Sequence, residues 1–154
     1  MRHSPEQWRL FIDTSKTSLK AVLLHNGSKL PSIPVAYAPS IKETYTTMNN
    51  ILVEAHYKKY QWEVCGDLKV IAFLLGLQAG YTKYSFLLYE LDSRARDNHC
   101  SRKHWSHRQA LTPGMKNVIH KPLTKPSKVL LSPLHIKLGL MKDFVIFYSF
   151  LLYI

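Results

Sequence analysis

The stretch WRLFIDTSKTSLKAVLLHNG, residues 8–27, contains the first strand signals of the chain and an acidic residue among them. In WRLFIDT, Leu10 and Ile12 alternate with Phe11 and Asp13. This is the two-residue period of a β-strand that buries one of its faces. The sequence therefore predicts a first strand that ends close to a carboxylate.

The second half of this stretch, SLKAVLLHNG, runs apolar into Asn26-Gly27. This dipeptide readily takes the positive φ angles of a tight hairpin turn. Residues 32–38, SIPVAYA, fit the returning strand. Pro34 within them indicates a sheet edge or a bulge, because proline has no backbone donor for a ladder. We therefore expect a three-stranded antiparallel meander at the start of the chain.

The hydrophobic period changes after the meander. Tyr45, Met48, Leu52 and Ala55 have the spacing of one stripe of an amphipathic helix. We expect this helix to run from about residue 43 to about residue 60 and its stripe to pack in the core.

Three further apolar elements follow this helix. QWEVCGD, residues 61–67, fits a short buried strand, and DLKVIAFLLGL, residues 67–77, fits a helix with Asp67 as its N-cap. KYSFLLYE, residues 83–90, is the predicted fifth strand. The expected order is three strands, a helix, a strand, a helix and a strand.

This order predicts an α/β fold with a mixed five-stranded sheet flanked by helices, in which right-handed parallel crossovers follow the meander. The first and fourth strands then lie side by side, so Asp13 and Asp67 approach each other at the carboxyl ends. Neighbouring carboxylates repel, and Mg²⁺ or Mn²⁺ between them would activate a water for attack on a phosphodiester. In the alternative interpretation, Asp13 only ends a strand and Asp67 only caps a helix.

The length of this chain, 154 residues, fits one domain with one hydrophobic core. Basic and acidic residues are distributed unequally over three segments of the chain. Residues 1–93, the predicted core, carry ten Lys/Arg against eight Asp/Glu. Residues 94–128 carry nine against one and are expected to form a basic loop or insertion. Residues 129–154 carry two against one. Within this last segment, residues 132–150 fit a closing helix and residues 144–154 form a divergent apolar tail.

The basic block at 94–128 has a net charge of +8. Such a block suits a polyanion, because each neutralised phosphate releases counterions. We expect nucleic acid, DNA in particular, as the partner, whereas the alternative is a solvated loop of a basic protein. The candidate nucleic-acid-binding residues are Arg94, Arg96, Arg102, Lys103, Arg108 and Lys116.

The cysteines and the two ends indicate an intracellular protein of the nucleus or cytoplasm without a membrane anchor. Cys65 and Cys100 do not make a disulfide framework, and MRHSPEQWRLF lacks the apolar stretch of a secretory signal. The terminal run FVIFYSFLLYI is shorter than the about 20 residues that span a bilayer. Its abrupt apolar end predicts a truncated chain.

Three segments carry a likeness to known proteins: residues 8–27, CGDLKVIAFLLGLQAGYTKY at 65–84, and LHIKLGLMKDFV at 134–145. They resemble a group of ribonuclease H-like, DDE-type transposase-related proteins, which occur as uncharacterised mobile-element copies in arthropod genomes. The likeness covers residues 5–145. It implies a ribonuclease H-like core that cuts or joins DNA strands with a divalent metal. Asp13 and Asp67 match the first two catalytic and metal-binding acids.

The sequence departs from this group at two points. The related proteins carry a Cys-x-x-Cys and a later histidine after the segment matching YTKY, but Phe86 and Tyr89 occupy the matching positions here. Zinc needs about four such N or S ligands, so we do not expect it. The candidates for the third catalytic acid within this chain are Glu90, Asp92 and Asp143, and none of them lies in a matching motif. In a full-length relative this acid is expected beyond residue 145.

These departures favour a truncated, inactive transposase-derived protein that keeps a ribonuclease H-like core and binds nucleic acid at most. Two alternatives stay open. The first is an active metal-dependent core that cleaves or transfers DNA strands, and the second is an unrelated small basic globular protein.

Overall fold

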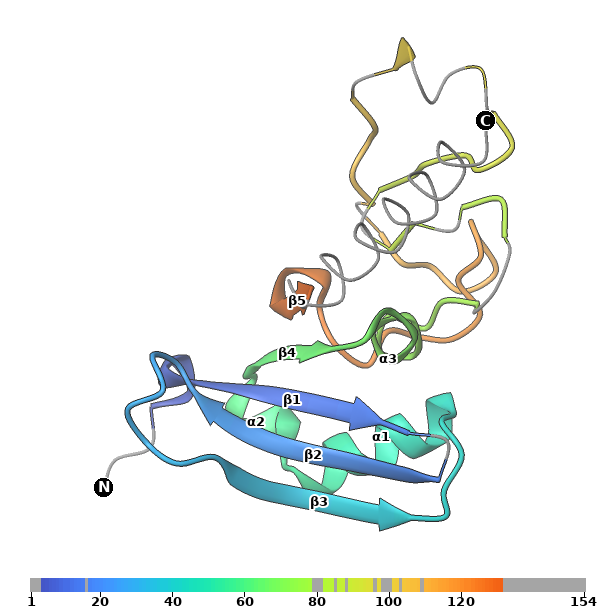
Figure 1. Cartoon of the computed structure of the whole chain (residues 1–154). Helices are drawn as coiled ribbons and strands as arrows, with labels where there is room; N and C mark the ends of the chain where they lie inside the picture. The colour runs from blue at the N-terminus through green and yellow to red at the C-terminus, as the bar shows by residue number, and fades with distance from the viewer. Residues whose placement is uncertain are drawn as a thin grey trace, which may run out of the picture.

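A computed structural model gives the fold of the chain (Figure 1). It describes residues 4–15, 17–78, 82–84, 86–87, 89–95, 97, 101–102, 104–108 and 110–131. The helices and strands are η1 (Pro5–Gln7), β1 (Trp8–Thr14), β2 (Ser18–His25), β3 (Ile33–Pro39), α1 (Tyr45–Glu54), α2 (Tyr57–Tyr60), β4 (Glu63–Gly66), α3 (Leu68–Leu74), η2 (Pro126–Lys128) and β5 (Val129–Leu131). The predicted closing helix at 132–150 lies outside the described residues.

The strands form one five-stranded sheet in the order β3-β2-β1-β4-β5. β1 pairs antiparallel with β2, and β2 pairs antiparallel with β3. β4 joins β1 in parallel, and β5 joins β4 in parallel. The predicted α/β fold with a mixed five-stranded sheet flanked by helices is therefore confirmed, as is the adjacency of the first and fourth strands.

The meander follows the sequence pattern closely. In β1 the buried side chains of Leu10 and Ile12 alternate with more exposed ones. β3 is an edge strand, and its pairing with β2 shifts register between Ala21 and Val22, opposite Ala36 and Pro34. The predicted edge or bulge at Pro34 is thus confirmed.

The fifth strand is not the predicted one. β5 comes from residues 129–131, whereas residues 83–90 form no strand in their described part and contribute only an isolated bridge between Tyr89 and His107. The carbonyl oxygens of Tyr84 and Phe86 accept hydrogen bonds from a guanidinium, that of Arg108, instead of from a neighbouring strand. The apolar run at 83–90 was therefore a misleading strand signal.

The helices differ from prediction in length. The expected helix over 43–60 is broken into α1 and α2, because His56 takes a left-handed conformation with φ of 51° between them. α3 begins where predicted, after Asp67, and its chain reverses at Gly76, which has φ of 69°. Positive φ is accessible to glycine without steric cost, which explains this stop.

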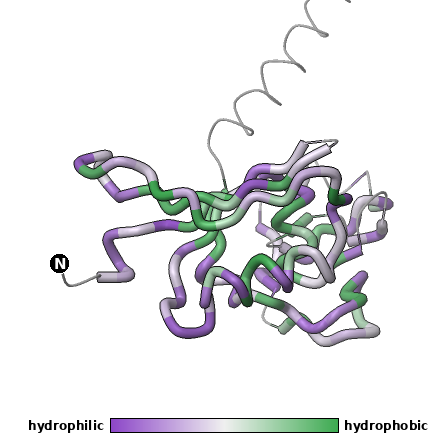
Figure 2. The backbone as a smooth tube through the Cα atoms, turned by 90° about the horizontal axis from the view of Figure 1, so that it is seen from below, coloured by the Kyte–Doolittle hydropathy of each residue, from purple (hydrophilic) through white to green (hydrophobic). Residues whose placement is uncertain are grey.

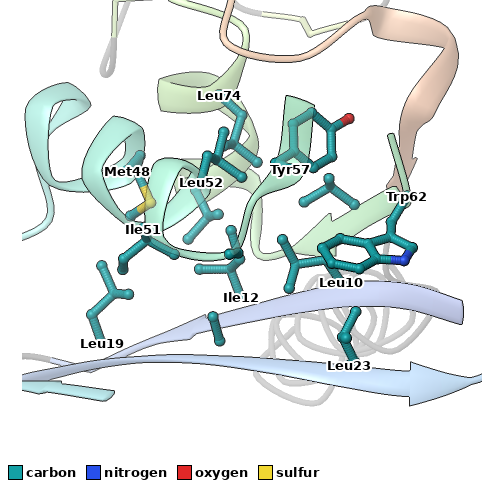
Figure 3. Close-up of a cluster of buried hydrophobic side chains, with 14 of the residues drawn as sticks. Leu10, Ile12, Leu19, Leu23, Met48, Ile51, Leu52, Tyr57, Trp62 and Leu74 are labelled. Atoms are coloured by element: carbon teal, nitrogen blue, oxygen red, sulfur yellow. The ribbon is translucent and has the colours of Figure 1, made fainter. Parts of the chain in front are cut away.

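Both α1 and α3 cover the same face of the sheet. The main core fills the space between these helices and the sheet (Figure 3). Leu10 and Ile12 of β1 meet Met48 and Leu52 of α1 and Leu74 of α3 there. Burial of such side chains is worth roughly 1.5–3 kcal/mol each before the entropy of ordering is subtracted. Figure 2 colours the backbone by hydropathy and shows hydrophilic residues concentrated at several loops.

A second buried cluster joins α3 to residues from later in the chain. In it, Ile71 of α3 and the C-cap residue Leu75 pack with Val118 and Val129. Val118 lies in the segment 94–128, so the described residues of this segment are not all solvated. Among the described residues, no helix is long and apolar enough to cross a membrane.

Gly76 attaches this later segment to the end of α3. Its carbonyl oxygen accepts from the backbone N–H groups of Ile119 and His120 at 2.8 and 3.0 Å. A Cβ at Gly76 would lie 2.1 Å from the carbonyl oxygen of His120. The close approach of these two backbones thus requires glycine.

We expect Gly76→Ala to lower the free energy of unfolding by about 3 kcal/mol, from left-handed strain plus backbone overlap. The matched control is Gly27→Ala, because Gly27 has φ of 86° and nothing within 4 Å of an added Cβ. It should lose only about 1 kcal/mol. Urea unfolding measures both, and equal losses would contradict the close backbone contact.

Candidate functional site

The two predicted acids lie at the ends of neighbouring parallel strands, Asp13 within β1 and Asp67 directly after β4. In the pairing of β1 with β4, Ile12 lies opposite Gly66. Asp13 is the residue after Ile12, and Asp67 is the residue after Gly66. Both therefore lie at the carboxyl ends of adjacent strands, as the sequence predicts. We call this region the carboxyl edge, defined by Asp13, Thr14 and Asp67.

Gly66 permits the close approach of the elements at the carboxyl edge. An added Cβ would lie 2.8 Å from the carbonyl oxygen of Ile12 and 3.0 Å from Cγ1 of Val70. The absence of a side chain at Gly66 thus allows β1, β4 and the first turn of α3 to meet.

Asp13 is the exposed member of the pair. It lies opposite Lys20 in the antiparallel pairing of β1 with β2, an arrangement in which opposite charges attract weakly. The alternating burial of β1 puts Asp13 on the other face of the strand from Ile12. Solvent therefore reaches this carboxylate.

Asp67 is half-buried and has two contacts within the protein. Its Oδ1 accepts from the backbone N–H of Val70 at 2.7 Å, which caps α3. Its Oδ2 accepts from the hydroxyl of Thr14 at 3.5 Å, the outer limit of a hydrogen bond. The alternative interpretation, in which Asp67 caps a helix, thus describes a real contact.

The candidates for a third acid are held by basic groups. Glu90 forms an ion pair with Lys116, and Asp92 forms one with Lys83 at 3.3 Å. The backbone N–H of Arg94 also donates to Asp92 and, with Lys83 as a smaller contribution, holds the pKa of that carboxyl below its usual value. Asp143 lies outside the described residues.

The donor set does not fit a cluster of cation ligands within the part of the chain that the structure describes. No three His, Cys, Asp or Glu side chains come together there. Cys65 is buried in β4, and burial raises the pKa of its thiol, so it is present as the neutral form. Cys100 lies outside the described residues.

The predicted nucleic-acid-binding residues are in different environments. Arg94 and Arg102 are exposed, and the Arg102 guanidinium lies 4.8 Å from the centre of the Trp105 ring. Lys116 is exposed but pairs with Glu90. Arg96 and Lys103 lie outside the described residues.

Arg108 does not fit the predicted role in nucleic-acid binding. Only 7% of the residue is exposed. Its guanidinium donates to the carbonyl oxygens of Tyr84 at 2.7 Å and of Phe86 and Lys116 at 3.1 Å each. It also donates to Oδ1 of Asn117 at 2.9 Å. Burial lowers the pKa of Arg108, while Glu90 opposes this shift, and the group remains a cation at neutral pH. Arg108 thus fixes the loop backbone.

The sequence reasoning missed two exposed cations of the same block, Lys121 and Lys125. Among the described residues, neither has a carboxylate within ion-pair distance. Their only signal was their place inside the basic block, which did not separate them from its other lysines and arginines.

We expect Asp67→Ala to lower the free energy of unfolding by about 1 kcal/mol, because α3 loses its N-cap. Asp67→Asn keeps an acceptor at this position and should stay close to the original protein. Asp13→Asn, at an exposed site, should change stability by less than about 0.5 kcal/mol. Chemical denaturation measures the three variants, and a large loss for Asp13→Asn would contradict its solvent-exposed position.

Arg108→Lys should lower the free energy of unfolding by about 2 kcal/mol or more, because an ammonium cannot reach the four acceptors of a planar guanidinium. Arg102→Lys is the matched control at an exposed position and should have an effect within about 0.5 kcal/mol. Thermal and urea unfolding compare the two. Equal stability would show that the guanidinium is not needed to hold the loop.

Comparison with known proteins gives one assignment. No curated protein and no solved structure matches the chain significantly. The model of a family described as a domain of unknown function, DUF8703, matches residues 1–124, and the chain therefore belongs to this family.

Proposed function

We propose that the chain is a ribonuclease H-like domain derived from a transposase, which binds nucleic acid and does not cut it. The observation that carries the proposal is the sheet order β3-β2-β1-β4-β5, with Asp13 near the carboxyl end of the central strand β1 and Asp67 directly after β4. The sheet order and the shared edge are what the resemblance to transposase-related proteins implies, whereas Asp13 lies on the face of β1 opposite Ile12 and Asp67 contacts Thr14. The likeness of fold alone would not specify an activity.

The contacts of the acids favour the absence of cleavage. Metal-assisted phosphodiester cleavage needs several oxygen ligands directed to one point. Asp67 instead caps α3, and Glu90 and Asp92 pair with lysines. Releasing these carboxylates for a cation would cost the cap and the ion pairs.

Exposed cations support binding to a polyanion. Arg94, Arg102, Lys121 and Lys125 are exposed, and none of them has an ion pair among the described residues. Cations that bind phosphates give affinity that does not depend on base sequence and falls steeply with salt.

We expect a fluorescently labelled 20-nucleotide DNA, single-stranded or duplex, to bind in an anisotropy titration with an affinity that falls between 50 and 200 mM salt. Replacing Arg94, Arg102, Lys121 and Lys125 by Gln should lower the slope of log Kobs against log salt by up to about 4, one per lost phosphate contact. The affinity should not depend on base sequence.

The charge-matched control replaces four exposed lysines outside the block by Gln: Lys20, Lys29, Lys42 and Lys58. This variant has the same net charge and should keep the original slope. An equal loss in both variants would reduce the association to a general effect of charge, and no binding of either DNA would refute the proposal.

The alternative, an active nuclease or transferase, is tested with supercoiled plasmid and Mn²⁺ or Mg²⁺. We expect no nicking above that of a protein carrying Asp13→Asn together with Asp67→Asn. Nicking that this double substitution abolishes, with DNA binding kept, would establish the alternative.

A further inference from the structure

Two segments of irregular chain meet beside the basic block. The backbone N–H of Glu90 donates to the carbonyl oxygen of Ser106 at 2.8 Å, and Tyr89 and His107 form an isolated bridge. We call the described residues of 86–90 and 104–108 the bridged loop. The Arg108 guanidinium donates to the carbonyl oxygens of Tyr84 and Phe86 and so also connects the two segments.

The bridged loop presents a row of aromatic rings. The ring centres of Phe86 and Tyr89 are 5.6 Å apart, and those of Tyr89 and His107 are 4.3 Å apart. Phe86 remains 43% exposed, and His107 is exposed too. Phe86 and His107 therefore keep part of their rings accessible to a ligand in solvent.

A second aromatic group in the same loop combines with a cation. Arg102 lies over the ring of Trp105, with its guanidinium carbon 4.8 Å from the ring centre. Arg102 is exposed and is also bonded through Nε to the carbonyl oxygen of His104 at 3.0 Å. The bridged loop and the nearby Arg102 therefore combine a guanidinium plane with several rings.

A pocket of about 210 Å³ adjoins this surface, lined by His107 and Arg108 together with Leu87, Leu111, Pro126 and Ser127. Its lining combines apolar side chains with the imidazole ring of His107, which suits a flat ring. Lys125 and Lys128 flank the segment that closes this pocket on one side.

We infer that the bridged loop binds single-stranded nucleic acid by stacking of unpaired bases on its rings, with the exposed cations holding the backbone. This inference rests on the proposed function and specifies its ligand. Bases in a duplex already stack on one another, so their faces are hidden from protein rings, whereas every unpaired base offers a face. Stacking of this kind tolerates any base sequence. This agrees with the proposed binding of phosphates by exposed cations, which does not depend on base sequence either.

The test compares one labelled 15-nucleotide DNA, single-stranded and as a duplex with its complement, at 150 mM salt. We expect the single strand to bind at least tenfold more tightly. Phe86→Leu and Trp105→Leu, which keep apolar bulk, should each weaken binding of the single strand about tenfold and leave the duplex unchanged, since one stacked base is worth about that factor.

The matched control is Tyr37→Leu on β3, because Tyr37 is 64% exposed and has Lys20 above its ring at 5.9 Å. It should keep the affinity of the original protein. Duplex binding as tight as single-strand binding, or losses no larger than that of Tyr37→Leu, would overturn this inference and leave the proposed function standing. Absence of binding to either DNA would refute both.

A readout without any variant guards against loss of folding. Trp8 and Trp62 are 8% and 3% exposed, so the half-exposed Trp105 is the tryptophan that a base can reach. We expect the single strand to quench tryptophan fluorescence with the same titration midpoint as the anisotropy. Binding without quenching would exclude stacking at Trp105 and so contradict the inference.

Discussion

The parallel contact between β1 and β4 is the constraint on which the rest of the structure depends. It joins the antiparallel meander to the crossover half of the sheet, and Gly66 makes it close enough for Val70 of α3 to pack against both strands. β4 ends at this glycine, and the next residue is the N-cap of α3. The position of Asp67 is therefore set by backbone packing as much as by any chemistry, and its use as an N-cap follows from that geometry.

The elements that the sequence predicts well are those whose signal is local. β1 and β2 alternate in burial along several residues, Pro34 marks an edge, and Asp67 starts a helix; each is decided by neighbours in the chain. β5 has only three residues and pairs with β4 across more than sixty residues of chain, so no periodicity could indicate it. The sequence predicts that Asp13 and Asp67 lie at the same edge of the sheet. The contact of Asp67 with Thr14 depends on the tertiary structure, and the spacing of residues in the sequence does not indicate it.

Acidic and basic side chains in this domain largely serve its own structure. Glu43 pairs with Lys69, which brings the approach to α1 against the start of α3, and Glu90 and Asp92 hold lysines of the irregular region. Exposed pairs of this type contribute little to stability, about 0–1 kcal/mol each. Their effect on chemistry is larger, because a carboxylate with a lysine beside it is partly neutralised and offers less charge to a cation. A core of this shape can thus retain its sheet while its acids take structural positions.

Arg108 explains how a long segment with little regular structure is ordered. A strand fixes its neighbours through a ladder, whereas this guanidinium supplies donors to carbonyl oxygens at Tyr84, Phe86 and Lys116 from one buried point. A buried cation is tolerated only when its donors are satisfied, so the surrounding backbone must keep these carbonyls in place. The carbonyl oxygen of Phe86 is one of these acceptors, so the backbone that carries the Phe86 ring is held by the buried arginine. The buried cation of Arg108 thus holds the backbone of this region, while the Phe86 ring and cations such as Arg94 and Arg102 are exposed at its surface.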